Sequence, residues 1–190
     1  MTKQLVVLVG LPGSGKTKWC RDKTDWTVVS RDVIRHTSFR CTYDEETEFD
    51  VDTMFAETII EALTAPAQTV CVDDLNLTRD ERESLILAGR IAGREVIAHV
   101  MPMQHNRDLL QRANGDLARL AKEHPSLRVS AFTQEAFDAI ARRFEPVAHD
   151  EGFDEIVFEA GPEPPSKAID ALRTKEATPN AEEPLPLFSS

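Results

Sequence analysis

Short apolar segments alternate with helical patterns along most of this 190-residue chain. Val, Ile and Leu dominate five near-continuous apolar runs, at residues 4–10, 26–30, 69–74, 95–101 and 155–160. Such runs are typical of strands covered on both faces, as in a parallel sheet. Between them, helical patterns occupy residues 15–23, 31–37, 45–64, 79–92, 105–123 and 133–144. The alternation predicts an α/β three-layer domain with a central parallel sheet of about five strands.

The pattern stops after residue 160. Residues 161–190 are rich in Pro, Glu and Ala and have little periodicity. Such a composition buries too little apolar surface to offset the entropy of ordering the chain. We therefore predict one folded domain at residues 1–160, followed by a mostly disordered, acidic, Pro-rich tail at residues 161–190.

The composition excludes several classes of protein. No apolar run is long enough to span a bilayer, and the start of the chain shows no small-residue cleavage site of a secretory signal. Three cysteines lie far apart in sequence, which suits a reducing cytoplasm better than a disulfide framework or a zinc site. These features predict a cytoplasmic protein that has no membrane partner.

The net charge of −11 is unevenly distributed. Residues 150–190 hold ten acidic and three basic side chains, whereas residues 1–40 hold eight basic and three acidic ones. Much of the acidity therefore lies in the tail, and the beginning of the domain is electropositive. This distribution leaves an anionic substrate open without requiring one.

A glycine-rich loop follows the first predicted strand and fits the pattern G-x-x-x-x-G-K-[ST]. Glycines let the backbone turn tightly and direct its N–H groups inward, and the start of the following helix adds partial positive charge. The lysine reaches the β- and γ-phosphates, and the threonine hydroxyl binds Mg²⁺. The loop predicts binding of ATP or another nucleoside triphosphate, with Mg²⁺, by Gly10, Pro12, Gly13, Ser14, Gly15, Lys16 and Thr17.

Two further segments place charged side chains after strands. In "SRDVIR", Asp32 and Arg35 are three residues apart and share one face of a helical turn. They suit a phosphoryl acceptor or, equally, form a surface ion pair. In "VCVDDLN", Asp73 and Asp74 end an apolar strand, where a carboxylate is expected near Mg²⁺. Alternation along the strand lets only one of the two face the site.

Taken in order, "GLPGSGKTKW", "SRDVIR" and "DDLNLTRDER" resemble the polynucleotide 5′-kinase family of P-loop phosphotransferases, particularly the phage-type kinase domain. The resemblance covers roughly residues 4–160, and the last part matches less closely. It implies that Lys16 and Thr17 contact the donor phosphates and Mg²⁺. It also implies that Asp32 is the base that activates a 5′-hydroxyl and that Arg35 binds the acceptor's 3′-phosphate.

The resemblance extends to an acceptor pocket and a lid helix. It implies that Asp74 and Asn76 line the pocket, and it leaves Arg82 either functional or structural. The family's lid carries arginines about a turn apart, and here Arg112 and Arg119 are the candidates. The family spacing is not kept, because Ala113 follows Arg112 and Asp116 stands where the second arginine is expected. Exposed helix arginines without a ligand are the alternative interpretation.

The leading hypothesis is a kinase that transfers the γ-phosphate of ATP to a 5′-hydroxyl end of DNA or RNA during end healing, in a bacterial or phage-infected cell. The alternatives are a P-loop kinase of a nucleoside, sugar nucleotide or antibiotic, and a regulatory module that binds nucleotide without phosphoryl transfer. The family includes multimers, so an oligomer is open.

The end of the tail, "EEPLPLFSS", resembles short peptides that dock onto bacterial sliding clamps. Such peptides usually begin with Gln, and Pro184 stands at that position here. A disordered tail with scattered apolar residues is the alternative. The docking hypothesis is that Leu185, Leu187 and Phe188 recruit the protein to a replication or repair partner.

Overall fold

The five predicted strands form one parallel sheet in the computed structural model, which describes residues 2–160. The strand order is β2-β3-β1-β4-β5, so β1 lies at the centre. The predicted tail and its candidate docking residues Leu185, Leu187 and Phe188 lie outside the described residues. The strands are β1 (Gln4–Val9), β2 (Thr27–Ser30), β3 (Thr69–Asp73), β4 (Glu95–Val100) and β5 (Glu155–Phe158).

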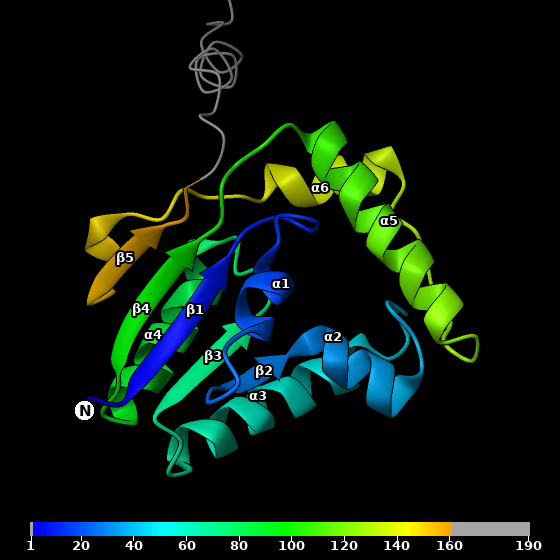
Figure 1. Cartoon of the computed structure of the whole chain (residues 1–190). Helices are drawn as coiled ribbons and strands as arrows, with labels where there is room; N and C mark the ends of the chain where they lie inside the picture. Colours follow the sequence, from blue (N-terminus) through cyan, green and yellow to red (C-terminus); the bar gives the residue numbers. More distant parts are fainter. Residues whose placement is uncertain (1, 161–190) are drawn as a thin grey trace, which may run out of the picture.

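Helices cover both faces of the sheet, as the sequence predicts (Figure 1). They are α1 (Lys16–Arg21), α2 (Arg31–Ile34), α3 (Glu48–Thr64), α4 (Arg79–Ile91), α5 (Asn106–Glu123) and α6 (Gln134–Arg142), with a π-helical turn η1 (Arg35–Phe39) and a 3₁₀ turn η2 (His149–Glu151). Among residues 2–160, no helix is both long and apolar enough to cross a bilayer. The three-layer α/β architecture is confirmed.

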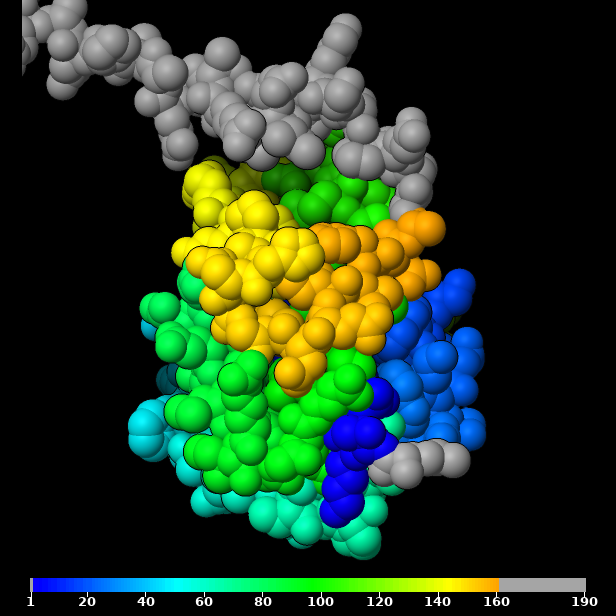
Figure 2. Space-filling view, turned by 90° about the vertical axis from the view of Figure 1, so that its left-hand side faces the viewer, coloured from blue at the N-terminus to red at the C-terminus, as the bar shows by residue number. Residues whose placement is uncertain are grey.

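The main core lies between the sheet and the two helices α3 and α4. Val7 and Val72 of the sheet pack in one cluster with Phe55 of α3 and Ile86 of α4. A smaller cluster on the other face joins the sheet to Cys20 of α1. Figure 2 shows the edge of the sheet, where β5 and the segment leading to it lie on the surface.

The pattern of α3 is the one place where the expected core was wrong. The apolar pattern of this helix predicts that Phe49, Met54, Phe55, Ile59 and Leu63 are buried, but Phe49 is 80% exposed and Met54 is also exposed. The buried stripe runs through Val51 and Phe55, four residues apart. Because each helical residue turns by about 100°, Phe49 lies about 200° from Val51 and faces solvent.

Strand order determines where a site can form. The chain leaves β1, builds β2 and β3 on one side, and then crosses to β4 on the other side of β1. In open parallel sheets, ligands bind beyond the carboxyl ends of the strands at such a reversal. The glycine-rich loop leaves β1 at this point, between β1 and α1 (Figure 1).

Candidate functional site

The glycine-rich loop adopts a conformation that depends on its glycines. Gly13 and Gly15 have φ angles of 75° and 101°, which L side chains rarely adopt. A Cβ atom on Gly13 would lie 2.3 Å from the carbonyl oxygen of Leu109 in α5. Gly13 is therefore required both by its own backbone and by the contact with α5, which lies directly against the loop.

Lys16 is folded back into this loop. Its Nζ donates to the carbonyl oxygens of Gly10 at 2.7 Å and Leu11 at 2.9 Å. The residue is only 7% exposed, and burial lowers the pKa of its ammonium to about 8, against the opposing effect of Asp73, Asp74 and Asp32. A buried ammonium that bonds only its own loop is available to anionic oxygens that enter the loop.

Thr17 and Asp73 bring two oxygen donors together beside the loop. The Thr17 hydroxyl donates to Asp73 Oδ2 at 2.8 Å. Burial raises the pKa of the Asp73 carboxyl, while the Thr17 hydrogen bond and Lys16 oppose that rise. Mg²⁺ takes oxygen ligands, typically one or two carboxylates together with substrate phosphates, so this pair fits the ion. Of the two acids that end β3, Asp73 is the one that meets Thr17.

Asp74 turns toward α2 instead. Its Oδ2 accepts a hydrogen bond from Arg31 Nε at 2.8 Å. The same guanidinium pairs with Asp52 of α3 and lies 4.5 Å from the ring centroid of Phe55. Arg31 therefore connects the end of β3 to α3, a role that the sequence did not reveal. Of the adjacent residues Arg31 and Asp32, the sequence predicts a role only for Asp32.

Asp32 and Arg35 are brought together as their spacing predicts, with Arg35 Nη1 donating to Asp32 Oδ1 at 2.7 Å. Arg35 also makes a two-pronged contact with Glu48, through Nε at 2.9 Å and Nη2 at 2.7 Å. Glu48 was missed, since thirteen residues separate it from Arg35 and no local pattern links them. The Asp32 side chain remains 67% exposed.

Asn76 is part of the frame of the site. It has a φ angle of 48°, is buried, and donates through Nδ2 to the carbonyl oxygen of Leu8 at 2.7 Å. This bond ties the turn after β3 to β1. Asn tolerates the left-handed region better than most residues, which accounts for its presence here.

Arg82 is fully buried and forms a two-pronged pair with the Glu151 carboxylate at 2.7 and 2.8 Å. Its Nη1 also donates to the carbonyl oxygen of Leu77 at 2.8 Å. Of the two roles left open by the sequence, the structure supports the structural one, because every arm of the guanidinium is occupied inside the protein.

The two candidate lid arginines lie on α5, which is continuous across residues 113–116. Arg112 and Arg119 are seven residues apart, so two helical turns place them on the same side of the helix. Arg112 bonds Gln104 and the carbonyl oxygen of Asp108, and Arg119 pairs with Asp116 at 2.7 Å. Both side chains are on the surface, and neither contacts the glycine-rich loop among the hydrogen bonds of residues 2–160.

A sequence model described as an AAA domain matches residues 5–147, which is most of the chain. The chain belongs to this family. The family assignment and the geometry agree on a P-loop kinase-like fold, with the loop of β1 and the carboxylate of β3 side by side. A comparison with curated proteins found no match.

Solved structures resemble this AAA-domain chain in fold. A candidate kinase from Chloroflexus aurantiacus has a TM-score of 0.59 and 17% identity, covering 94% of this chain and 100% of its own. A chain of the Pnkp1/Rnl/Hen1 RNA repair complex has a TM-score of 0.57 and 17% identity, covering 75% of this chain and 44% of that one. A gluconokinase from Sinorhizobium meliloti has a TM-score of 0.51 and 16% identity, with 85% of each chain covered.

Proposed function

We propose that the protein is an ATP- and Mg²⁺-dependent polynucleotide 5′-hydroxyl kinase that acts in the repair of DNA or RNA ends. The observation that carries the proposal is the position of Asp32. Its carboxylate is exposed, yet it lies near both buried charged groups of the loop region. Burial is the main cause that lowers the pKa of Lys16, and Asp32 partly opposes it. Burial is the main cause that raises the pKa of Asp73, and Asp32 adds to it. An accessible base thus stands beside a phosphate loop and an Mg²⁺-type oxygen pair.

Each residue has a defined task in this proposal. Asp32 accepts the proton of the acceptor hydroxyl. The hydroxyl oxygen forms a bond to the γ-phosphorus while the bond between that phosphorus and the β–γ bridging oxygen breaks. Lys16 and the loop N–H groups hold the donor phosphates, and Arg112 and Arg119 close over the transferred group. Thr17 and Asp73 would hold Mg²⁺, which would neutralise charge on the phosphates.

Arg35 is the residue that selects the acceptor in this proposal. Its guanidinium already binds a carboxylate in the two-pronged manner that suits a phosphate equally well. A 3′-phosphate of the acceptor would replace Glu48 on Arg35, while Asp32 stays beside the 5′-hydroxyl. Asp74, held by Arg31, borders the same region. The structural likeness to a chain of an RNA repair complex supports a nucleic-acid acceptor.

The test offers labelled ATP and a 5′-hydroxyl oligonucleotide to the wild type and to Asp32→Asn. Loss of a general base typically lowers kcat by about 10²- to 10⁴-fold. We expect a fall of that size, with an unchanged dissociation constant for ATP. Asp25→Asn, which removes another exposed carboxylate, is the control and should retain full activity.

The alternatives give different outcomes in the same assay. A small-molecule kinase would transfer label to a nucleoside, sugar nucleotide or antibiotic but to no oligonucleotide. A regulatory module would bind ATP and transfer label to none of them. Either result with the wild type would refute the polynucleotide proposal.

A further inference from the structure

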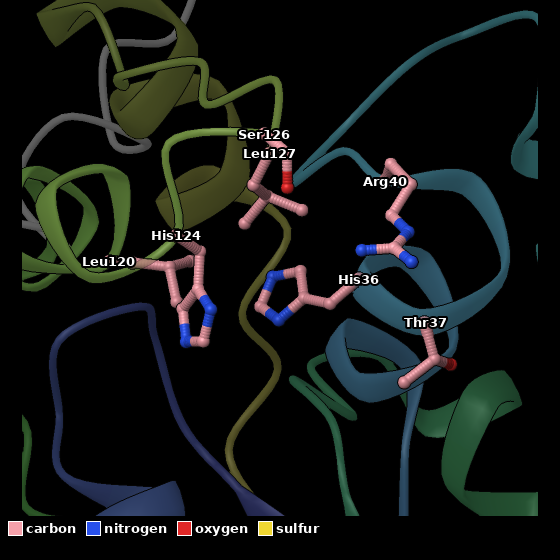
Figure 3. Close-up of a pocket in the computed structure, with 7 residues that line it drawn as sticks. All are labelled: His36, Thr37, Arg40, Leu120, His124, Ser126 and Leu127. Atoms are coloured by element: carbon pink, nitrogen blue, oxygen red, sulfur yellow. The ribbon is translucent and has the colours of Figure 1, made fainter.

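A pocket of about 380 Å³ opens between the turn η1 and the end of α5 (Figure 3). His36 and Arg40 line one wall, and Leu120, His124, Ser126 and Leu127 line the other. In Figure 3 the two imidazole rings of His36 and His124 point toward each other across the pocket, and the Arg40 guanidinium lies beside His36. None of the residues that line this pocket is acidic.

The basic groups of the pocket differ from the other cations of the site. Arg31, Arg35 and Arg119 each bond a carboxylate. Within residues 2–160, by contrast, no hydrogen bond or ion pair engages the side chains of Arg40, His36 or His124. A guanidinium and two imidazoles that line a cavity without an acidic lining residue suit an anionic ligand.

Backbone hydrogen bonds hold the two walls of the pocket together. The Arg128 N–H donates to the carbonyl oxygen of Arg40 at 2.9 Å, and the Thr42 N–H donates to the carbonyl oxygen of Arg128 at 3.0 Å. Arg40 itself has a φ angle of 56°, a strained value for arginine, and follows a π-helical turn. Both features concentrate at functional sites. The backbone of the chain itself therefore ties the two walls of the pocket to each other.

Asp32 lies on α2, which continues directly into η1 and so into one wall of this pocket. The pKa of His36 is lowered overall, mainly by burial and further by Arg35 and His124. The nearby Asp32 carboxylate opposes this shift. The same carboxylate raises the pKa of Lys16, which burial lowers. His36 follows Asp32 by four residues and Arg40 by eight, so Arg40 lies at the far end of the π-helical turn η1. A ligand whose hydroxyl is at Asp32 must extend beyond its first unit to reach Arg40.

We infer that the pocket binds a phosphodiester group of the acceptor strand, one nucleotide beyond the group held by Arg35. Arg40, with His36 and His124, contacts the phosphate oxygens. Leu120 and Leu127 pack against the adjoining sugar or base. This inference rests on the proposed function, because it places the 5′-hydroxyl of the strand at Asp32. It identifies the acceptor as a strand of at least two or three nucleotides, rather than a single nucleotide or a phosphorylated metabolite.

Direct binding tests the inference without any need for phosphoryl transfer. Dissociation constants are measured for a nucleoside 3′-phosphate and for a trinucleotide, both with a 5′-hydroxyl, against wild type and Arg40→Ala. A charge-assisted hydrogen bond contributes about 1.5–3 kcal/mol, or roughly 10- to 100-fold in affinity. We expect Arg40→Ala to raise the dissociation constant of the trinucleotide by at least tenfold and to leave that of the nucleoside 3′-phosphate unchanged.

Further variants separate the pocket from a loss of folding. Ser126→Glu places a negative charge at the exposed rim and should also weaken the trinucleotide selectively, whereas Arg40→Lys should restore part of the affinity. Arg142→Ala on α6 removes an exposed arginine that is distant from the pocket in sequence and should change nothing. Melting temperatures within a few degrees of wild type confirm that each variant is folded.

The outcomes distinguish this inference from the proposed function. If Arg40→Ala changes the dissociation constants of both ligands equally, or changes neither, the inference is overturned even if the wild type phosphorylates oligonucleotides. If Arg40→Ala weakens the binding of inorganic phosphate or a sugar phosphate but not that of the trinucleotide, the pocket binds a small metabolite. That result also overturns the inference. Selective weakening of the trinucleotide in a protein that transfers no phosphate supports the pocket and refutes the kinase.

Discussion

The proposed donor side and the proposed acceptor side of the site are built in opposite ways. The donor side consists of Gly10–Thr17 and Asp73, and Lys16 and Asp73 are both buried there. The acceptor side consists of α2, η1 and the end of α5, where the Asp32 side chain is 67% exposed. Donor phosphates are shared by many enzymes and are met by a rigid loop from one stretch of chain. The acceptor differs between enzymes and is met by side chains from separate segments.

Removal of the buried Lys16 charge from the proposed donor loop is expected to have the largest effect. Lys16→Met should lower kcat/KM by about 10²- to 10³-fold, as the loss of one preorganised electrostatic group does. The melting temperature without nucleotide should change by less than about 4 °C, because removal of a desolvated charge offsets the lost hydrogen bonds. Steady-state transfer and thermal unfolding measure the two effects. A large drop in melting temperature would mean that Lys16 serves the fold.

A second variant breaks the close packing of the donor loop against α5. Gly13→Ala adds a Cβ atom 2.3 Å from the Leu109 carbonyl oxygen, at a φ angle of 75°. Gly93→Ala is the matched control, because its φ angle is 66° and its Cβ would meet nothing within 4 Å. The shared backbone strain costs each about 1–2 kcal/mol, and the clash adds about 1–3 kcal/mol for Gly13 alone. Denaturant unfolding of both variants measures the difference, and equal losses would exclude the clash.

The lowered pKa of Lys16 predicts a pH dependence confined to the donor side. In the free protein the ammonium is charged below its pKa of about 8 and loses its proton as the pH rises through that value. Nucleotide phosphates need the charged form, so the dissociation constant should rise up to about tenfold between pH 7 and pH 9. Calorimetric titration with an ATP analogue measures it. Lys16→Arg keeps its charge throughout this range and should show a flat profile.

The smallest effect is expected when Arg35, on the proposed acceptor side, loses its charged partner Glu48. Glu48→Gln removes the carboxylate that binds Arg35, so an acceptor phosphate no longer has to displace a charged partner. Even exposed ion pairs contribute about 0.2–1 kcal/mol, and this pair is partly buried, so the KM for the oligonucleotide should fall by about fivefold, with the KM for ATP unchanged. Glu57→Gln, on the same helix, is the control. A rise in the oligonucleotide KM would show that Glu48 holds Arg35 in its binding position.

Much of the fold followed from local pattern. All five strands and their parallel arrangement agree with the apolar runs, because a doubly covered strand needs apolar residues on both faces. The same reasoning was incomplete for α3, where Phe49 is exposed although it is apolar. It also missed Arg94, a buried arginine that donates to the carbonyl oxygen of Leu63 at 2.9 Å and thereby caps α3. No local signal distinguishes such an arginine from one on the surface.

By itself, the sequence determined the donor loop, since its glycines, Lys16 and Thr17 lie within eight consecutive residues and act through their own backbone. Only the tertiary structure decided which acid of β3 meets Thr17, that Glu48 and Asp74 hold the arginines of the acceptor side, and that η1 and α5 enclose a basic pocket. The physical reason is separation along the chain. Contacts between residues 13 to 91 positions apart depend on how the sheet orders its strands, which no local pattern encodes.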